Sequence, residues 1–126
     1  MSAESPSSQS FKVERHGDVA IITPSAEVEK MSEMLIQQAA QMVLAPLRSD
    51  PPAGLIIDLS QVSYFGSVFI SFLLRCHMLV KKHGSEVVLA GASERIRELL
   101  HLTALDTLWA LYDSREEALE QFASSD

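Results

Sequence analysis

Alternation of apolar and polar side chains marks the first structured part of the chain. Phe11 to Arg15 alternates the two kinds of residue, His16-Gly17-Asp18 carries a turn signal, and Val19 to Ile22 continues as an apolar run. These features predict a β-hairpin. Three short and mostly apolar runs follow at residues 55–59, 86–90 and 108–112. Such runs are typical of strands in a parallel sheet with both faces covered, so we expect three more strands.

Between these strands lie segments in which apolar residues recur every three to four positions, a spacing that predicts helices. It runs through residues 31–47, 67–83 and 93–100, and a capping-box pattern at 114–117 opens a fourth stretch. Pro46 is expected to end the first helix, because proline lacks the N–H that a helix interior requires. Gly84 is expected to end the second helix.

Strands and helices are therefore predicted in the order ββαβαβαβα. Strand–helix–strand successions favour parallel crossovers, so we expect an α/β fold, on the border of α+β. Its sheet should be mixed and mostly parallel, with an N-terminal hairpin and four helices. We assign a single domain to residues 11–122. Residues 1–10 are rich in serine and are expected to form a disordered tail, and residues 123–126 a short C-terminal tail.

Length and charge narrow the class of protein. With 126 residues and 47% hydrophobic content, the chain fits one compact domain. A formal net charge of −7 opposes binding to nucleic acid or to anionic membranes. No stretch resembles a membrane helix or a signal peptide. The single cysteine, Cys76, has helical spacing to apolar neighbours, which predicts a buried thiol and favours a cytoplasmic location.

The sequence carries no catalytic or cofactor motif that we recognise. Its glycines are isolated, so the phosphate-binding loop and the dinucleotide fingerprint are both missing, and its histidines lack metal-ligand spacing. We therefore expect no cofactor, no metal and no enzymatic activity. A small serine hydrolase built on Ser67, a histidine and Asp58 is a remote alternative, because Phe65 and Phe69 occupy the glycine positions of the nucleophile elbow.

Ser67 is the candidate functional residue, since it lies where the loop after the strand at 55–59 enters a helix. Its hydroxyl is predicted to cap that helix, and Gly66 to supply a backbone conformation that other residues avoid. The same position suits a phosphoacceptor, because a phosphate gains from the positive end of a helix. One helix face beside it combines apolar and cationic side chains, which fits either an interaction surface or ordinary solvent exposure. This face consists of Val68, Ser71, Arg75, Met78 and Lys82.

Two blocks of the sequence, taken with the element order, resemble a known family. The stretch from Leu55 to Ser67 and the stretch from Ala90 to Leu105 are similar to those of STAS domains, in particular of bacterial anti-sigma factor antagonists. The resemblance covers residues 11–122. It implies a regulatory, non-enzymatic protein that binds an anti-sigma factor.

The family pattern also implies a role for Ser67. Members usually read Asp-Ser-x-Gly or Asp-Thr-x-Gly at this place, and the hydroxyl is phosphorylated by a partner serine kinase that is itself the anti-sigma factor. A serine phosphatase reverses the modification. Ser67 matches the hydroxyl position, whereas Gly66 replaces the aspartate and Phe69 the glycine. The resemblance thus implies a phosphorylation switch. Partner contacts would be made through Gly66 and through the helix face that begins at Val68. The alternative is an unphosphorylated STAS scaffold in a larger assembly, either stressosome-like or associated with a transporter.

Overall fold

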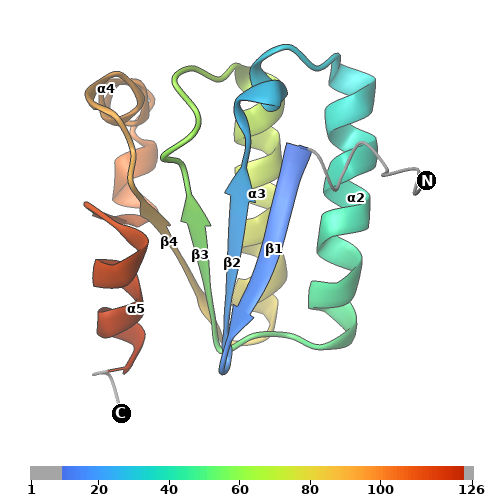
Figure 1. Cartoon of the computed structure of the whole chain (residues 1–126), viewed down its shortest axis with the longest axis vertical. Helices are drawn as coiled ribbons and strands as arrows, with labels where there is room; N and C mark the ends of the chain where they lie inside the picture. Colours follow the sequence, from blue (N-terminus) through green and yellow to red (C-terminus); the bar gives the residue numbers. More distant parts are fainter. Residues whose placement is uncertain (1–9, 124–126) are drawn as a thin grey trace, which may run out of the picture.

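The computed structural model describes residues 10–123, which form one β-sheet flanked by helices (Figure 1). The elements are β1 (Phe11–His16), β2 (Val19–Pro24), η1 (Ala26–Glu29), α2 (Glu33–Ser49), β3 (Gly54–Asp58), α3 (Ser67–Lys82), β4 (Glu86–Ala90), α4 (Glu94–Leu102), η2 (Leu105–Thr107), β5 (Ala110–Tyr112) and α5 (Arg115–Ala123). The predicted order of strands and helices is confirmed. The tails predicted at 1–10 and 123–126 lie outside the described residues except for Ser10, which is buried, and Ala123, which ends α5.

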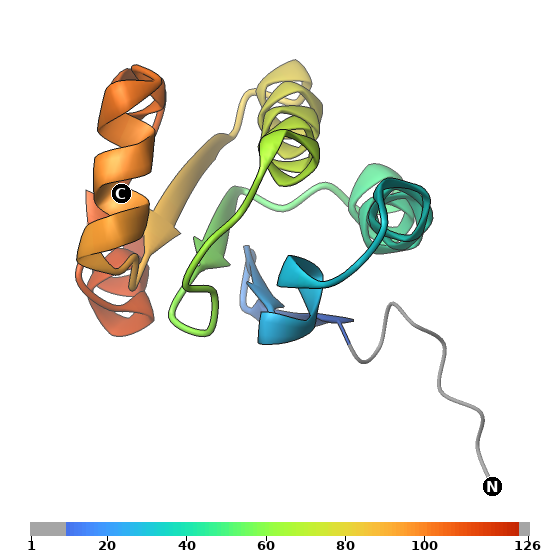
Figure 2. The ribbon, with the colours of Figure 1, turned by 90° about the horizontal axis from the view of Figure 1, so that it is seen from above.

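The five strands lie in the sheet in their sequence order, β1-β2-β3-β4-β5. β1 and β2 are antiparallel, and every later pair is parallel, as the sequence predicted. Figure 2 shows α2 and α3 on one side of the sheet, while α5 lies on the opposite side beside β3 and β4 (Figure 1). The carboxyl ends of β2, β3, β4 and β5 therefore meet at one edge, where the connecting loops lie.

The core has a larger and a smaller part, one on each face of the sheet. Leu55 and Ile57 of β3 point into the larger part, which Phe69, Phe72 and other residues of α2, α3 and α4 complete. Ile56, between them, points into the smaller part under α5. This alternation is the period of two that a strand imposes, and it explains why residues 55–57 are all apolar.

Pro46 does not end α2, which continues to Ser49. Proline removes one backbone donor, but the Pro46 carbonyl still accepts hydrogen bonds from Asp50 N at 3.0 Å and from Ser49 Oγ at 3.2 Å. Leu44 and Leu47, on either side, are fully buried. Burial of this turn against the core outweighs the lost hydrogen bond.

The last strand is shorter than the run at 108–112 predicts and begins at Ala110. Leu105–Thr107 forms the 3-10 helix η2 just before it, and the Trp109 indole N–H donates to His77 Nδ1 of α3 at 3.1 Å. Trp109 is buried in the larger core. Its side chain is thus fixed to the helical layer, and only three residues are left to extend the sheet.

Among the described residues, no helix has both the length and the apolar character needed to cross a membrane.

Candidate functional site

The candidate site is the loop between β3 and α3, at the carboxyl edge of the parallel sheet. Two backbone hydrogen bonds hold its start: Leu59 N donates to Ala90 O at 2.8 Å, and Val62 N donates to Leu59 O at 3.1 Å. Leu59, Val62 and Phe65 are buried in the larger core. The loop is therefore anchored by every third side chain and presents the residues between them to solvent.

Asp58, the last residue of β3, anchors the loop on the other face of the sheet. Its Oδ1 accepts from Ser60 N at 2.9 Å, and its Oδ2 accepts from Arg115 Nε at 2.9 Å. Arg115 also donates to Glu14 Oε2 at 3.0 Å and to Thr23 Oγ1 at 2.7 Å. Burial opposes ionisation of Asp58, but the hydrogen bonds from Ser60 and Arg115 outweigh it and hold its pKa below the usual value.

This network leaves Asp58 no role in a hydrolase triad. His77 bonds to Trp109, and His101 lies 3.0 Å from Asp106, so neither ring is paired with Ser67. Within residues 10–123, no hydrogen bond joins Ser67 to a histidine. The same part of the chain holds no group of three or more metal-ligating side chains.

A carboxylate from η1 holds the middle of the loop, which the sequence patterns did not reveal. Glu29 Oε2 accepts from Ser63 N at 2.8 Å and from Ser63 Oγ at 3.0 Å. These bonds, with a further backbone contribution from Tyr64, lower the pKa of Glu29 below its ordinary value. Glu29 and Ser63 are 34 positions apart in the sequence, so no local sequence pattern contains this contact.

Ser67 is not the cap of α3, which corrects the sequence prediction. The N-cap residue is Gly66, and no side chain caps the helix there. Ser67 is the first helical residue, so its hydroxyl lies beyond the geometry of a cap. Gly66 has an extended backbone (φ −110°), which any residue adopts, and a Cβ at this position would meet nothing within 4 Å. The predicted need for glycine is therefore wrong as well.

The Ser67 hydroxyl is exposed, and within residues 10–123 the structure gives it no hydrogen-bond partner. Its two neighbouring serines differ in this respect. The Ser63 hydroxyl donates to Glu29, and the Ser71 hydroxyl donates to the Ser67 carbonyl at 3.2 Å. Ser67 alone of the three thus presents a free hydroxyl, at the positive end of a helix.

A cavity of about 280 Å³ opens beside Ser67. Its walls are mainly apolar and come from η1, the connection to α2, α2 itself, the loop and the start of α3. Val28, Met31, Ile36, Phe65 and Phe69 are among the lining residues. Glu29, Tyr64 and Ser67 supply polar atoms to the same cavity. Phe69, at the position of the family's glycine, is itself buried and packs against Phe65 with ring centroids 5.2 Å apart.

The helix face predicted beside Ser67 is present at the surface. Ser71 and Lys82 are exposed, and Met78 has 69% of its surface open to solvent. Val68 and Arg75 are half-buried. The face therefore extends from Gly66 along the whole of α3.

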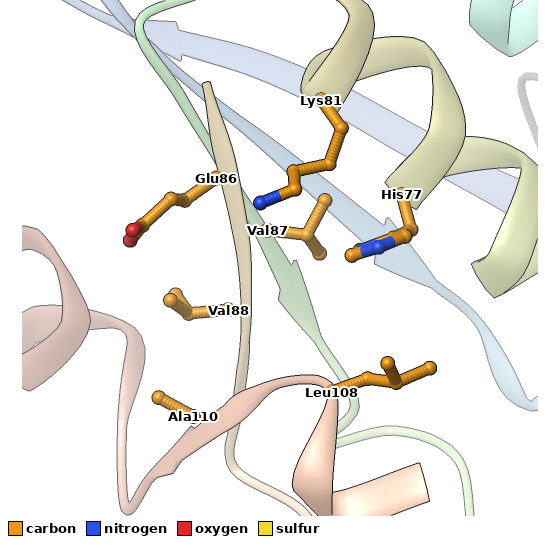
Figure 3. Close-up of a pocket in the computed structure, with 7 residues that line it drawn as sticks. All are labelled: His77, Lys81, Glu86, Val87, Val88, Leu108 and Ala110. Atoms are coloured by element: carbon orange, nitrogen blue, oxygen red, sulfur yellow. The ribbon is translucent and has the colours of Figure 1, made fainter. Parts of the chain in front are cut away.

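A second cavity, of about 250 Å³, lies between α3 and the outer edge of β4 (Figure 3). Figure 3 shows Lys81 and His77 projecting from α3 towards Val87 and Leu108. It exists because β5 pairs only with Val88 to Ala90 and leaves the start of β4 uncovered. His77 lies ten residues along α3 from Ser67, or about 15 Å of helix, so this cavity is separate from the candidate site.

Comparison with known proteins gives consistent matches over nearly the whole chain. Residues 10–118 match the family model of the STAS domain. The anti-sigma-F factor antagonist RsfB of Mycobacterium tuberculosis is 29% identical over 114 residues, which is 90% of this chain and 89% of the relative.

Two solved structures have the same fold. An anti-sigma-factor antagonist (STAS) domain protein from Planctomyces limnophilus is 30% identical, with a TM-score of 0.79 over 90% of this chain and 98% of the other. An anti-sigma factor antagonist from Mycobacterium paratuberculosis is 28% identical, with a TM-score of 0.72 over 88% and 91% of the two chains. The order of strands and helices described above is therefore that of the solved relatives.

Proposed function

Because the chain belongs to the STAS domain family, we propose that it is an anti-sigma factor antagonist whose partner binding is switched by phosphorylation of Ser67. Relatives matching nearly its full length carry the name of anti-sigma factor antagonist. Such proteins are regulatory rather than enzymatic, in agreement with the sequence prediction.

The observation that carries this proposal is the free hydroxyl of Ser67 at the start of α3. It is exposed, and its neighbours Ser63 and Ser71 both use their hydroxyls within the chain. A phosphate at the first helical position also gains from the unpaired backbone N–H groups of the first turn. Ser67 is therefore the serine of this loop best suited to accept a phosphoryl group.

Phosphorylation at Ser67 would change the charge of the surrounding surface. The phosphate adds about −1.5 to −2 charges at neutral pH. Glu29 lines the same cavity as Ser67 and is held ionised by Ser63. A partner that packs an apolar group into this cavity would meet two like-charged groups in place of one, so the modified protein should be released.

The proposed contact surface consists of Gly66, Val68, Ser71, Arg75, Met78 and Lys82. Met78 is largely exposed although it is apolar, which is the kind of side chain that a partner covers. The proposed partners are an anti-sigma factor with serine kinase activity and a serine phosphatase, and neither nucleic acid nor membrane insertion is part of the proposal. A cytoplasmic location belongs to it too, with Cys76 reduced and buried.

The test is intact mass spectrometry after incubation with the partner kinase and ATP. We expect one added phosphate on the native chain and on the matched variants Ser63→Ala and Ser71→Ala, and none on Ser67→Ala. Phosphorylated protein should then fail to co-elute with the anti-sigma factor in gel filtration. An unmodified native chain, or a phosphate that remains in Ser67→Ala, would contradict the switch.

A STAS scaffold that is never phosphorylated is the second candidate, and Gly66 and Phe69 favour it. The family pattern places a carboxylate and a bare backbone around the phosphoacceptor, whereas here Phe69 is a buried core residue. For a scaffold, Ser67→Asp should bind its partner as tightly as the native chain. The switch instead requires that Ser67→Asp lose binding while Ser71→Asp retains it.

A further inference from the structure

Charge is distributed unevenly between the two helices that cover the larger core and the rest of the chain. The whole chain carries seventeen acidic and ten basic side chains. By contrast, α2 and α3 together carry four cations, Arg48, Arg75, Lys81 and Lys82, and one carboxylate, Glu33. The two helices that cover the larger core therefore carry a net positive charge in a strongly acidic protein.

Three of these cations line one groove between the two helices, which lie side by side in Figure 2. Arg48 comes from α2, and Arg75 and Lys82 come from α3. Leu44, Met78 and Leu79 complete a cavity of about 280 Å³. Leu44 is almost fully buried, while Met78 is 69% exposed. The groove thus combines an apolar lining with three positive charges.

These three cations make no ion pair within residues 10–123, whereas Arg15, Arg97 and Arg115 each do. Arg97 bonds to Asp113 at 2.9 Å, and Arg115 bonds to both Asp58 and Glu14. Cations near the last turn of a helix also interact with the helix dipole, which accounts for Arg48 and Lys82. Arg75 lies in the middle of α3 and is half-buried, so the dipole does not explain it.

We propose that the groove between α2 and α3 docks an acidic amphipathic segment of a partner protein. Carboxylates of that segment would pair with Arg48, Arg75 and Lys82, and its apolar residues would pack on Met78 and Leu79. The inference rests on the proposed function, since α3 is also the proposed partner-binding helix, and it adds the chemistry of the segment. Three cations on a chain of net charge −7 suit a short local acidic segment better than the extended polyanions of nucleic acid or membranes.

The test uses the full ¹⁵N-labelled chain and a synthetic helical peptide of about 15 residues, with glutamate on one face and leucine on the other. We expect amide shift changes on α2 and α3 around Arg48, Arg75 and Met78, and an affinity that falls as salt rises. The variant with Arg48→Gln, Arg75→Gln and Lys82→Gln should bind about tenfold more weakly or worse.

Matched controls distinguish docking in the groove from a non-specific effect of net charge and from unfolding of the variant. Lys12→Glu reverses a cation on β1 that is 71% exposed, and it should change the affinity by less than about twofold. Circular dichroism checks that the glutamine variant is folded, and a peptide with lysine in place of glutamate should not bind. No shift changes, shift changes confined to the Ser67 cavity, or equal binding by the glutamine variant would overturn the inference.

Two further arms address other polyanions and the dependence on the proposed switch. Phosphatidylserine vesicles or duplex DNA that shift the same amides, with no effect of the peptide, would overturn the protein-segment proposal. If Ser67 is phosphorylated but the peptide does not bind, the docking proposal is wrong and the phosphorylation switch stands. If the peptide binds in the groove but Ser67 is not modified, the switch proposal is wrong and the docking proposal is supported.

Discussion

Arg115 joins the start of α5 to three strands. Its guanidinium bonds to Asp58 of β3, Glu14 of β1 and Thr23 of β2. Asp58 is 6% exposed, so its charge has little access to water once the arginine is removed. We expect Arg115→Ala to lower the free energy of unfolding by about 2 to 4 kcal/mol, because it leaves a buried carboxylate without its partner.

Urea unfolding measures this loss, and the double variant Arg115→Ala with Asp58→Asn provides the control. Removing the negative charge as well should restore part of the stability, because a neutral amide costs less to bury than an unpaired carboxylate. If the double variant is less stable than the native chain by the sum of the two single losses, the two residues are not coupled and the pairing is wrong.

Asp58 and Glu14 should also set the acid sensitivity of the fold. Hydrogen bonds from Ser60 and Arg115 outweigh burial at Asp58, and the bond from Arg115 acts at Glu14, so the folded pKa of each lies below its unfolded value. A carboxylate with a depressed pKa contributes stability that is complete above the unfolded pKa, near about 4, and is lost as pH falls through the folded pKa. Native protein should therefore lose stability below about pH 4 more steeply than Asp58→Asn, as measured by urea midpoints over pH 2 to 7. Parallel curves would contradict this.

Gly66→Asp is expected to stabilise the chain by a few tenths to about 1 kcal/mol. The N-cap position has extended backbone angles and open space for a side chain, and α3 has no side-chain cap. An aspartate would accept from the free N–H groups of the first turn. The comparison with Gly66→Ala, which fits the same space without an acceptor, isolates the cap, and equal melting temperatures for the two variants would count against it.

At the scale of elements, β3 and β4 form the centre of the sheet. Ile57 is fully buried under α2 and α3, and Val88 lies on the α5 face. Truncating either to alanine should cost about 2 to 4 kcal/mol, through lost burial and the cavity left behind. Val13→Ala, on the edge strand β1 with 38% exposure, should cost under about 1 kcal/mol. Chemical unfolding of the three variants gives the ranking, and similar losses at all three would contradict the assignment of the centre.

The helices and strands were predictable where a side-chain pattern repeats within one segment. Their bounds were less predictable where a contact with a distant residue sets the end of the element. Strand and helix order followed from periods of two and of three to four. The extent of α2 past Pro46 depended on burial of Leu47, and the start of β5 on the bond between Trp109 and His77. No local pattern contains those contacts, because their partners lie on other elements.

In the candidate site, too, contacts between residues that are distant in the sequence were not predictable. Ser67, Gly66 and the α3 face were identified from the sequence and its family resemblance, and the structure places them at the surface. Glu29, which holds the loop, is 34 residues from Ser63 and belongs to a connection predicted only as polar. The contribution of Arg48 to the groove likewise depends on α2 lying beside α3.

For the molecule as a whole, Cys76 should report on global unfolding. Its thiol is fully buried in the larger core, and burial raises its pKa far above the usual value. Neither solvent access nor thiolate formation is available in the folded state, so we expect alkylation by iodoacetamide only when the core opens. Labelling rates in increasing urea, followed by mass spectrometry, should track the loss of circular dichroism. Rapid labelling of folded protein would show that the core opens locally around α3.

The missing side-chain cap at Gly66 bears on how fast a modifying enzyme could act. A kinase that binds its substrate serine in an extended chain needs the first turn of α3 to open, and a helix end without a cap opens at low free-energy cost. The opening equilibrium of this turn then becomes a rate factor for phosphorylation. In a chain with aspartate at position 66 the same turn would be closed for more of the time, so a more stable helix would be a slower substrate.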